Sequence, residues 1–302
     1  MSSVPEALSR PLSAPLPVAA WLTPLELLAL GAIWGASFLF QRVAAPQFGA
    51  FALVEVRLAL GALVLLPFVW AARARIARGV WIKLALIGAL NSAIPFLLFA
   101  WGAARAPAAI GAISNSLAVM FTAIFAFVLY SERIGGRRLI GLVAGFAGVI
   151  VLVGSKTGGP GAPAAAIAGT IAALLYGLSG NLLRKHVANV PPVAVAGVTL
   201  LWSSLLVAPF AFATWPSQPV TTPAWGSAIA LGLVCTGFAY ALYFRLIQRI
   251  GAARAATVTY LVPLFGVTWA WLLLGEPLTG SMALAGTLIL GGVALSQQRA
   301  AR

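Results

Sequence analysis

Apolar residues follow one another in long blocks along the chain, and short polar segments separate the blocks. A helix that crosses a bilayer needs about 20 apolar residues, and most of ten blocks reach this length. Such continuous blocks do not fit the alternating pattern of a membrane β-barrel. The sequence therefore predicts an all-α integral membrane protein with ten transmembrane helices. The predicted spans are Leu22–Val43, Ala52–Ala72, Trp81–Trp101, Ala108–Tyr130, Leu139–Val153, Ala164–Leu183, Val193–Ala213, Trp225–Leu246, Ala252–Leu274 and Met282–Ser296.

Composition excludes a soluble protein. Apolar residue types make up 62% of the 302 residues and charged types only 8%, whereas soluble domains contain about 25% charged residues. A soluble fold of this size needs far more polar surface. Ten spans leave only short connections, so we expect no separate soluble domain.

The ten spans divide into two halves of five. We expect a disordered tail over residues 1–21, which is rich in Pro and Ser and lacks the basic-then-apolar order of a cleaved signal. The first five-helix half is predicted over 22–154 and the second over 164–298. Between them, residues 155–163 are rich in Gly and Pro and read as a linker.

Lys and Arg are distributed unequally between alternate loops. With the N-terminus in the cytoplasm, the cytoplasmic segments hold 15 of the 19 basic residues and the outer segments hold 3. Because short cytoplasmic loops are enriched in Lys and Arg, both termini are predicted to be cytoplasmic. The same residues produce the net charge of +14. They are spread over six short segments, so we expect no nucleic-acid partner.

The two halves are related in sequence. At an offset of 144 residues, the segment from Arg105 to Glu132 lies over the segment from Arg249 to Glu276, with nine of 28 positions identical. The first spans align more loosely, with Trp34 over Tyr176. Because each half has five spans, an odd number, the second copy would enter the membrane from the opposite side. This predicts an inverted repeat, the arrangement of carriers that work by alternating access.

Several motifs along the chain are similar to those of a known family. They are IWGASF, which ends at Phe38, the in-span Arg57, YSERI and LGEPL, TYLVPLFG around Pro263, and LAGTLILGGVAL. In these motifs the chain resembles the drug/metabolite transporter superfamily, in its ten-helix EamA-type form with two EamA repeats. This resemblance covers nearly the whole chain after the tail. The resemblance implies export of metabolites, including amino acids, and a bacterial inner membrane. Val119 stands where the second half has Pro263, so we expect a straighter fourth helix in the first half.

Enzymatic chemistry has little support. Catalytic and metal sites need clustered His, Cys, Asp or Glu, but the chain has one His, one Cys and five acidic residues. His186 falls in a loop, and no phosphate-binding Gly-rich motif is present. We therefore expect a protein that is not an enzyme and that has no metal and no cofactor.

Polar and aromatic side chains fall at mid-span depth in several helices of both halves. Ser, Thr and Asn also serve as contacts between membrane helices, so only some of them need face a substrate. Their recurrence in both halves nevertheless favours a shared central cavity. The candidate cavity residues are Trp34, Ser37, Phe38, Asn91, Ser92, Pro95, Asn115, Tyr176, Ser179, Asn181, Trp202, Tyr240, Tyr260 and Pro263.

Four charged residues near or within the spans require partners. Glu55 and Arg57 are two residues apart, about 200° around a helix, so they cannot face each other. Each is either a structural brace or a functional group, as a proton-coupling site for Glu55 or a carboxylate-binding site for Arg57. Glu132 and Glu276 each end a fourth helix. Either basic neighbours such as Arg133, Arg137 and Arg138 hold Glu132, or each Glu accepts backbone N–H groups at the start of the following helix.

The predicted cavity combines aromatic and amide side chains without a firmly central carboxylate. A carrier of organic cations would be expected to bury a carboxylate or an aromatic cage there, and a phosphate carrier a basic cluster. The sequence therefore favours an exporter of small neutral or zwitterionic metabolites, above all amino acids with aromatic or large apolar side chains. Its expected partners are this small molecule and the lipid bilayer. The alternatives are a proton-coupled drug exporter and a lipid or lipid-linked translocase.

Overall fold

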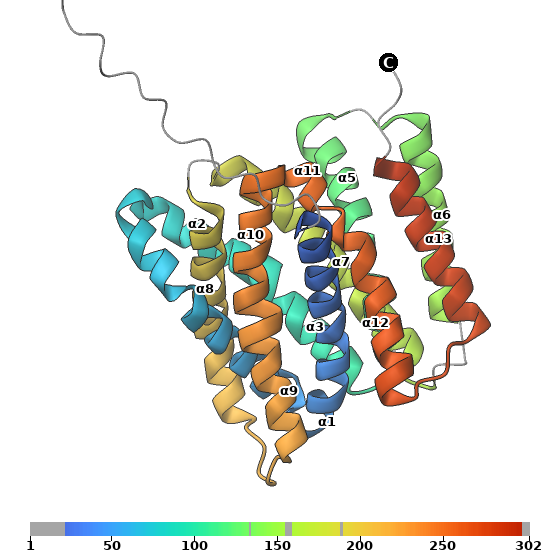
Figure 1. Ribbon diagram of the computed structural model, residues 1–302, viewed down its shortest axis with the longest axis horizontal. Helices are drawn as coiled ribbons and strands as arrows, with labels where there is room; N and C mark the ends of the chain where they lie inside the picture. Colours follow the sequence, from blue (N-terminus) through green and yellow to red (C-terminus); the bar gives the residue numbers. More distant parts are fainter. Residues whose placement is uncertain (1–21, 133, 155–158, 188–189, 298–302) are drawn as a thin grey trace, which may run out of the picture.

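The computed structural model describes residues 22–132, 134–154, 159–187 and 190–297 of the 302-residue chain. The expected disordered tail over 1–21 and the linker residues 155–158 lie outside the described residues. Within the described ranges every element is helical, which agrees with the predicted all-α class (Figure 1). The helices are α1 (Leu22–Ala72), α2 (Arg78–Gly88), α3 (Ile94–Ala103), α4 (Ala108–Asn115), α5 (Leu117–Tyr130), α6 (Gly136–Gly154), α7 (Ala162–His186), α8 (Pro192–Ala213), α9 (Thr222–Gly232), α10 (Ala239–Ile250), α11 (Ala252–Ala255), α12 (Val258–Leu274) and α13 (Gly280–Gln297), with short turns η1 (Arg73–Arg75), η2 (Ala89–Ala93) and η3 (Leu233–Phe238).

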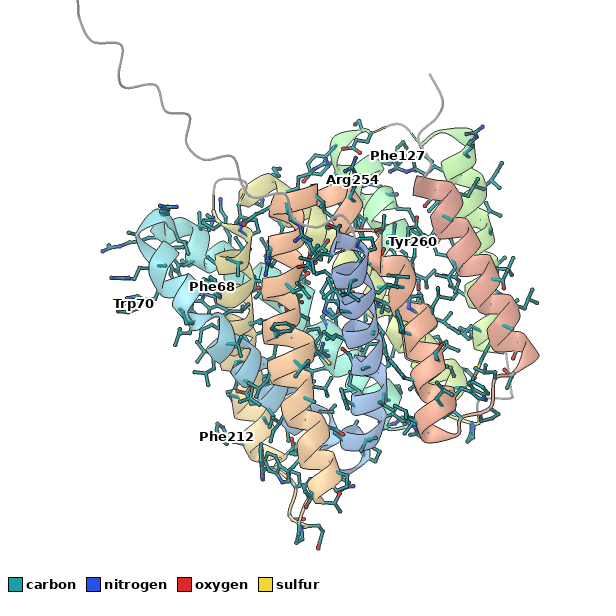
Figure 2. The ribbon with its side chains drawn as sticks, in the orientation of Figure 1. Phe68, Trp70, Phe127, Phe212, Arg254 and Tyr260 are labelled. Carbon is teal, nitrogen blue, oxygen red and sulfur yellow. The ribbon has the colours of Figure 1, made fainter. Side chains whose placement is uncertain are left out.

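The helices are long and apolar enough for a membrane protein. Seven helical stretches in the described ranges meet both criteria, from Leu22–Arg75 to Thr222–Ile250, and two shorter apolar helices follow at Val258–Leu274 and Gly280–Ser296. Large apolar side chains such as Phe68, Trp70 and Phe212 project from the outer surface (Figure 2). An apolar outer surface suits contact with lipid rather than with water.

Helix α1 is bent sharply at Gly49. A straight helix of 51 residues would be about 76 Å long, more than twice the roughly 30 Å of a bilayer core. Gly49 has φ of 71° and ψ of 168°, a left-handed conformation that glycine adopts without steric cost. The two parts of α1 diverge there in Figure 1, and the bend lies between the predicted spans Leu22–Val43 and Ala52–Ala72.

The bundle is arranged around α1. Helix α1 packs against α3, α8, α9 and α12, while α6 and α13 pair with each other at one edge of the molecule (Figure 1). These two edge helices run in opposite directions. Their backbones approach so closely that a Cβ atom at Gly141 would collide with the carbonyl oxygen of Gly292. Small residues at such contacts allow membrane helices to pack backbone against backbone.

Two helices carry a π-helical turn at corresponding places. Turn η2 interrupts α2–α3 at Ala89–Ala93, and η3 interrupts α9–α10 at Leu233–Phe238, so the two turns begin 144 residues apart. This is the offset that aligns the two halves in sequence. A π turn inserts one residue into the helical ladder and so rotates the side chains that follow it.

The expectation of a straighter fourth helix in the first half stays a prediction. The helical hydrogen-bond ladder breaks at Ser116, between α4 and α5, where the backbone keeps the helical angles φ −63° and ψ −22°, and at Ala256 and Thr257, between α11 and α12. Both breaks are tight turns in which a backbone N–H bonds three residues back, from Ser116 to Ile113 and from Thr257 to Arg254. Pro263 lies inside helix α12, whereas the corresponding Val119 lies inside α5.

Candidate functional site

A cavity of about 380 Å³ lies among α1, α3, α4, α5, α7, α10 and α12, beside the two π turns. Half of the residues predicted for a cavity line it, namely Trp34, Ser37, Phe38, Asn91, Asn115, Tyr176 and Tyr240. Arg57 also lines it. The other residues of the lining are Gln41, Phe96, Phe99, Ala118, Val119, Thr122, Cys235, Tyr243, Thr259 and Val262. Pockets for small ligands usually have volumes of about 300–1,000 Å³.

Several predicted cavity residues lie behind the lining, where they support it. The hydroxyl of Ser179 donates a hydrogen bond to Asn91 Oδ1 at 2.9 Å. The amide of Asn181 is buried and donates to the carbonyl oxygens of Thr122 and Gly177. Ser92, on turn η2, is fully buried. Ser179 and Asn181 thus hold the lining residues Asn91 and Thr122 in place without being part of the lining.

The remaining predicted residues lie elsewhere in the bundle. Pro95 and Pro263 are buried between helices. Tyr260 directs its hydroxyl to the carbonyl of Val293, on α13. Trp202, on α8, packs on a separate apolar cluster that includes Val69. The structure does not bring these four side chains into the cavity lining.

One lining residue missed in the sequence, Cys235, and its buried neighbour Thr236 come from the second π turn, η3. Cys235 and Thr236, on η3, stand 144 residues after Asn91 and Ser92, on η2. Cys235 lines the cavity as Asn91 does, and Thr236 is buried beside it. The 144-residue offset was a signal that could have found Cys235 from Asn91. Apolar lining residues such as Val262 carry no such signal, because they resemble every other core position.

Aromatic rings form much of the cavity wall. Trp34 lies 5.1 Å from Tyr243 and 6.2 Å from Tyr240 between ring centres. On the opposite side, Phe99 contacts Phe38 edge-on at 5.6 Å and stacks with Tyr176 at 6.2 Å. Such pairs are rigid and present both ring faces and polar edges to a ligand.

Arg57 brings a positive charge to the cavity. Its side chain is 92% buried, with 8% exposed, and its Nε donates a hydrogen bond to Thr236 Oγ1 at 2.9 Å. The guanidinium carbon lies 3.6 Å above the centre of the Phe96 ring, a cation–π contact. No described carboxylate forms an ion pair with Arg57.

Glu55 lies outside the lining. Its Oε1 accepts a hydrogen bond of 2.6 Å from Ser204, on α8, while its Oε2 is buried without a described partner. Glu55 and Arg57 therefore have separate partners on different helices.

In the described ranges, no group of three or more His, Cys, Asp or Glu residues is placed to hold a metal ion.

The two glutamates at the fourth-helix ends are held by groups from the other half of the chain. Glu276 accepts the backbone N–H of Ala108, at the start of α4, at 2.9 Å, and pairs with Arg42 at 3.3 Å. Burial raises the pKa of the Glu276 carboxyl, although the N–H of Ala108 and the charge of Arg42 act against that rise. Glu276 therefore accepts a backbone N–H at the start of a helix, as expected, but this helix is α4 and not the following helix α13.

Glu132 pairs with Arg184, at the end of α7, at 2.7 Å. The expectation that Arg137 or Arg138 would hold it is wrong in the described structure, because Arg184 reaches it from the neighbouring helix. Arg133, the third residue expected to hold it, lies outside the described residues.

A multi-helix apolar bundle around a partly polar cavity is an arrangement found in membrane transporters. Comparison with known proteins agrees with this class. The chain matches the EamA-like transporter family twice, over residues 22–154 and 163–297. It belongs to this family, whose repeat it carries in two copies.

Several relatives are named as transporters or efflux pumps. The chain is 26% identical over 278 residues to a probable amino-acid metabolite efflux pump of Escherichia coli, covering 86% of this chain and 90% of that protein. It is 26% identical over 198 residues to a protein of the same name from Salmonella typhimurium, covering 62% and 66%. It is also 28% identical over 249 residues to an uncharacterized protein of Pseudomonas aeruginosa, covering 82% and 83%.

The fold also has a counterpart among solved structures. A protein of known crystal structure superposes with a TM-score of 0.61 over 91% of this chain and 96% of its own length, at 22% sequence identity. At this identity the similarity extends to the fold alone.

Proposed function

We propose that the protein is a secondary transporter that works by alternating access, built from ten membrane spans in two inverted five-helix repeats over residues 22–154 and 164–298. The bend of α1 at Gly49 divides it into two spans of suitable length. The offset of 144 residues between η2 and η3 and the opposite directions of α6 and α13 support a repeat that is inverted. Such repeats place one gate on each side of a central site.

The orientation we propose places both termini in the cytoplasm and the protein in the bacterial inner membrane. The unequal distribution of Lys and Arg between the loops supports this orientation. The ion pair of Glu132 and Arg184 then lies at the cytoplasmic side, and that of Glu276 and Arg42 at the outer side.

The cargo we propose is a small neutral or zwitterionic metabolite, namely an amino acid with an aromatic or large apolar side chain. The observation that carries this proposal is the cavity itself, which has aromatic walls, amide groups from Asn91, Asn115 and Gln41, and no carboxylate in its lining. An organic cation would find no opposite charge there. The name of the Escherichia coli relative, a probable amino-acid metabolite efflux pump, agrees with this cargo.

Proton-coupled drug export is the alternative that a specific observation favours. Glu55 is an in-span carboxyl with one oxygen lacking a described partner, and in-span carboxyls commonly carry protons in transporters. Its place outside the cavity lining makes direct contact with a drug unfavourable. In this alternative Glu55 would therefore couple transport to protons and would not recognise the drug.

The proposal is tested by uptake into proteoliposomes of a panel of labelled amino acids, with and without an imposed pH gradient. Protein-free liposomes and liposomes that contain the Arg57→Gln variant serve as controls. We expect saturable uptake of aromatic and large apolar amino acids, with mutual competition. Uptake of a cationic drug in place of every amino acid would reject the proposed cargo, and loss of gradient dependence in Glu55→Gln would support proton coupling.

A further inference from the structure

Arg57 is a charged group that has a described acceptor for only one of its five N–H donors. We propose that its guanidinium binds the carboxylate of the cargo, so that the transporter selects carboxylates and rejects the matching amines. This inference rests on the proposed function and names the group of the substrate that the cavity recognises.

The charges of the protein itself do not neutralise Arg57. Glu55 bonds to Ser204, and Glu26, Glu132 and Glu276 each pair with another arginine. The fifth glutamate, Glu6, precedes the described residues. A cation within a membrane span is costly unless it has a partner or faces a polar cavity. Because Arg57 lines the cavity, a bound anion is the partner that would neutralise it.

The contacts of Arg57 orient its free end. Thr236 Oγ1 accepts the Nε–H, and Thr236 in turn donates its hydroxyl hydrogen to the carbonyl of Leu231 at 2.8 Å. Phe96 covers one face of the guanidinium. These contacts hold the guanidinium plane and leave both Nη groups without a described acceptor. A planar pair of N–H donors matches the two oxygens of a carboxylate.

The opposite charge of an amino acid would meet only neutral groups. Gln41 donates through its Nε2 to the carbonyl of Ser37 at 3.0 Å, which leaves its Oε1 buried in the cavity lining without a described partner. A neutral carbonyl oxygen can accept a hydrogen from an ammonium group, but it cannot balance its charge. An amine without a carboxylate would therefore add a second positive charge beside Arg57.

The inference makes different predictions for three compounds of nearly the same shape. Tryptophan has both groups, indole-3-propionate has only the carboxylate, and tryptamine has only the amine. We expect indole-3-propionate to bind within about tenfold of tryptophan and tryptamine to bind about 100-fold more weakly, because removing one member of a buried charge pair leaves the other unpaired. Binding is measured by calorimetry on the purified full-length protein in detergent.

Variants then assign the preference to Arg57. In Arg57→Gln we expect the affinity for tryptophan to fall about 30-fold or more and the preference for tryptophan over tryptamine to shrink to about threefold. Arg57→Lys keeps the positive charge but not the planar pair of N–H donors. We expect its affinity for tryptophan to lie between those of the unaltered protein and Arg57→Gln. The matched control is Glu55→Gln, which changes an in-span charge two residues away, outside the lining, and should leave all three affinities unchanged.

Each outcome decides the inference. Equal binding of tryptophan and tryptamine to the unaltered protein would overturn it, and this result needs no variant to fold. An unchanged preference in Arg57→Gln would overturn it as well. If amino acids are transported but the preference does not depend on Arg57, the proposed function stands and this inference fails. If the carboxylates bind through Arg57 but nothing is transported, the proposed function fails and this inference stands.

Discussion

The two ends of the molecule carry the same ion pair in two different surroundings. Arg42 and Arg184 correspond in the two halves, as do Glu276 and Glu132, and each arginine pairs with the glutamate of the other half. At one end the Glu276 carboxylate is 13% exposed, and Arg42 also donates to the carbonyl of Ala103 at 2.9 Å. At the other end the Glu132 carboxylate is 41% exposed, and Arg184 lies over the ring of Tyr130.

Aromatic packing is also tighter at the end of the molecule where the ion pair is less exposed. Phe38 and Phe99 contact each other on the side of Arg42, and the space beside them holds only about 10 Å³. The position that corresponds to Phe38 in the second half is the exposed Gly180, and a Cβ atom built there would meet nothing within 4 Å. The Glu276 end is therefore more closely packed than the Glu132 end. Alternating access would exchange these two arrangements.

The largest expected effect follows removal of the Glu276 carboxylate. Glu276→Ala leaves the N-terminus of α4 without its acceptor and Arg42 without its partner, which together contribute about 1–3 kcal/mol to closure. We expect the Glu276 end to open and net transport to fall. The measurement is labelling of a single cysteine, Val119→Cys in a Cys235→Ala background, by an impermeant maleimide added on that side of the membrane.

Glu132→Ala is the matched control for this variant. Its ion pair is more than one third exposed, and such pairs contribute about 0–1 kcal/mol. We expect labelling from the Glu276 side to stay unchanged. An increase as large as that of Glu276→Ala would contradict the difference between the two ends.

The sequence predicts the helices better than their contacts. Long apolar blocks define helices locally, so spans such as Ala108–Tyr130 could be read directly. The partners of Glu276 and Glu132 could not, because each comes from the other half of the chain. Half of the predicted cavity residues line the cavity, since depth in the membrane can be read from position. Which side of a helix faces inward also depends on the π turns, and these rotate Asn91 and Cys235 toward the cavity without a clear local signature.

A medium effect is expected from filling the gap at the less closely packed end. Gly180 is an exposed residue one helical turn after the cavity residue Tyr176 on α7, and a Cβ atom built there has no neighbour within 4 Å. Gly180→Phe would place a ring where Phe38 lies in the first half. We expect labelling of the Val119→Cys reporter from the Glu132 side to fall about threefold to tenfold, equivalent to about 0.7–1.4 kcal/mol. Gly180→Ala, which adds no ring, should leave the labelling rate unchanged. An equal fall of the labelling rate in both variants would show that the ring does not act by filling space at this end.

The smallest expected effect is a dependence of closure on pH. Burial raises the pKa of Glu276, so the closed end binds a proton more tightly than an open end in which the carboxyl has its ordinary pKa of about 4.3. Linkage then requires that lowering the pH through the raised pKa stabilises closure, and that raising the pH loses this contribution. Glu276→Gln keeps an acceptor for Ala108 but cannot titrate. The ratio of reporter labelling in the unaltered protein to that in Glu276→Gln cancels the pH dependence of the thiol, and we expect this ratio to fall on acidification. A constant ratio would show that the closed and open ends bind the Glu276 proton equally, and a ratio that rises on acidification would show that the closed end favours the ionised carboxylate beside Arg42; either result would contradict the prediction.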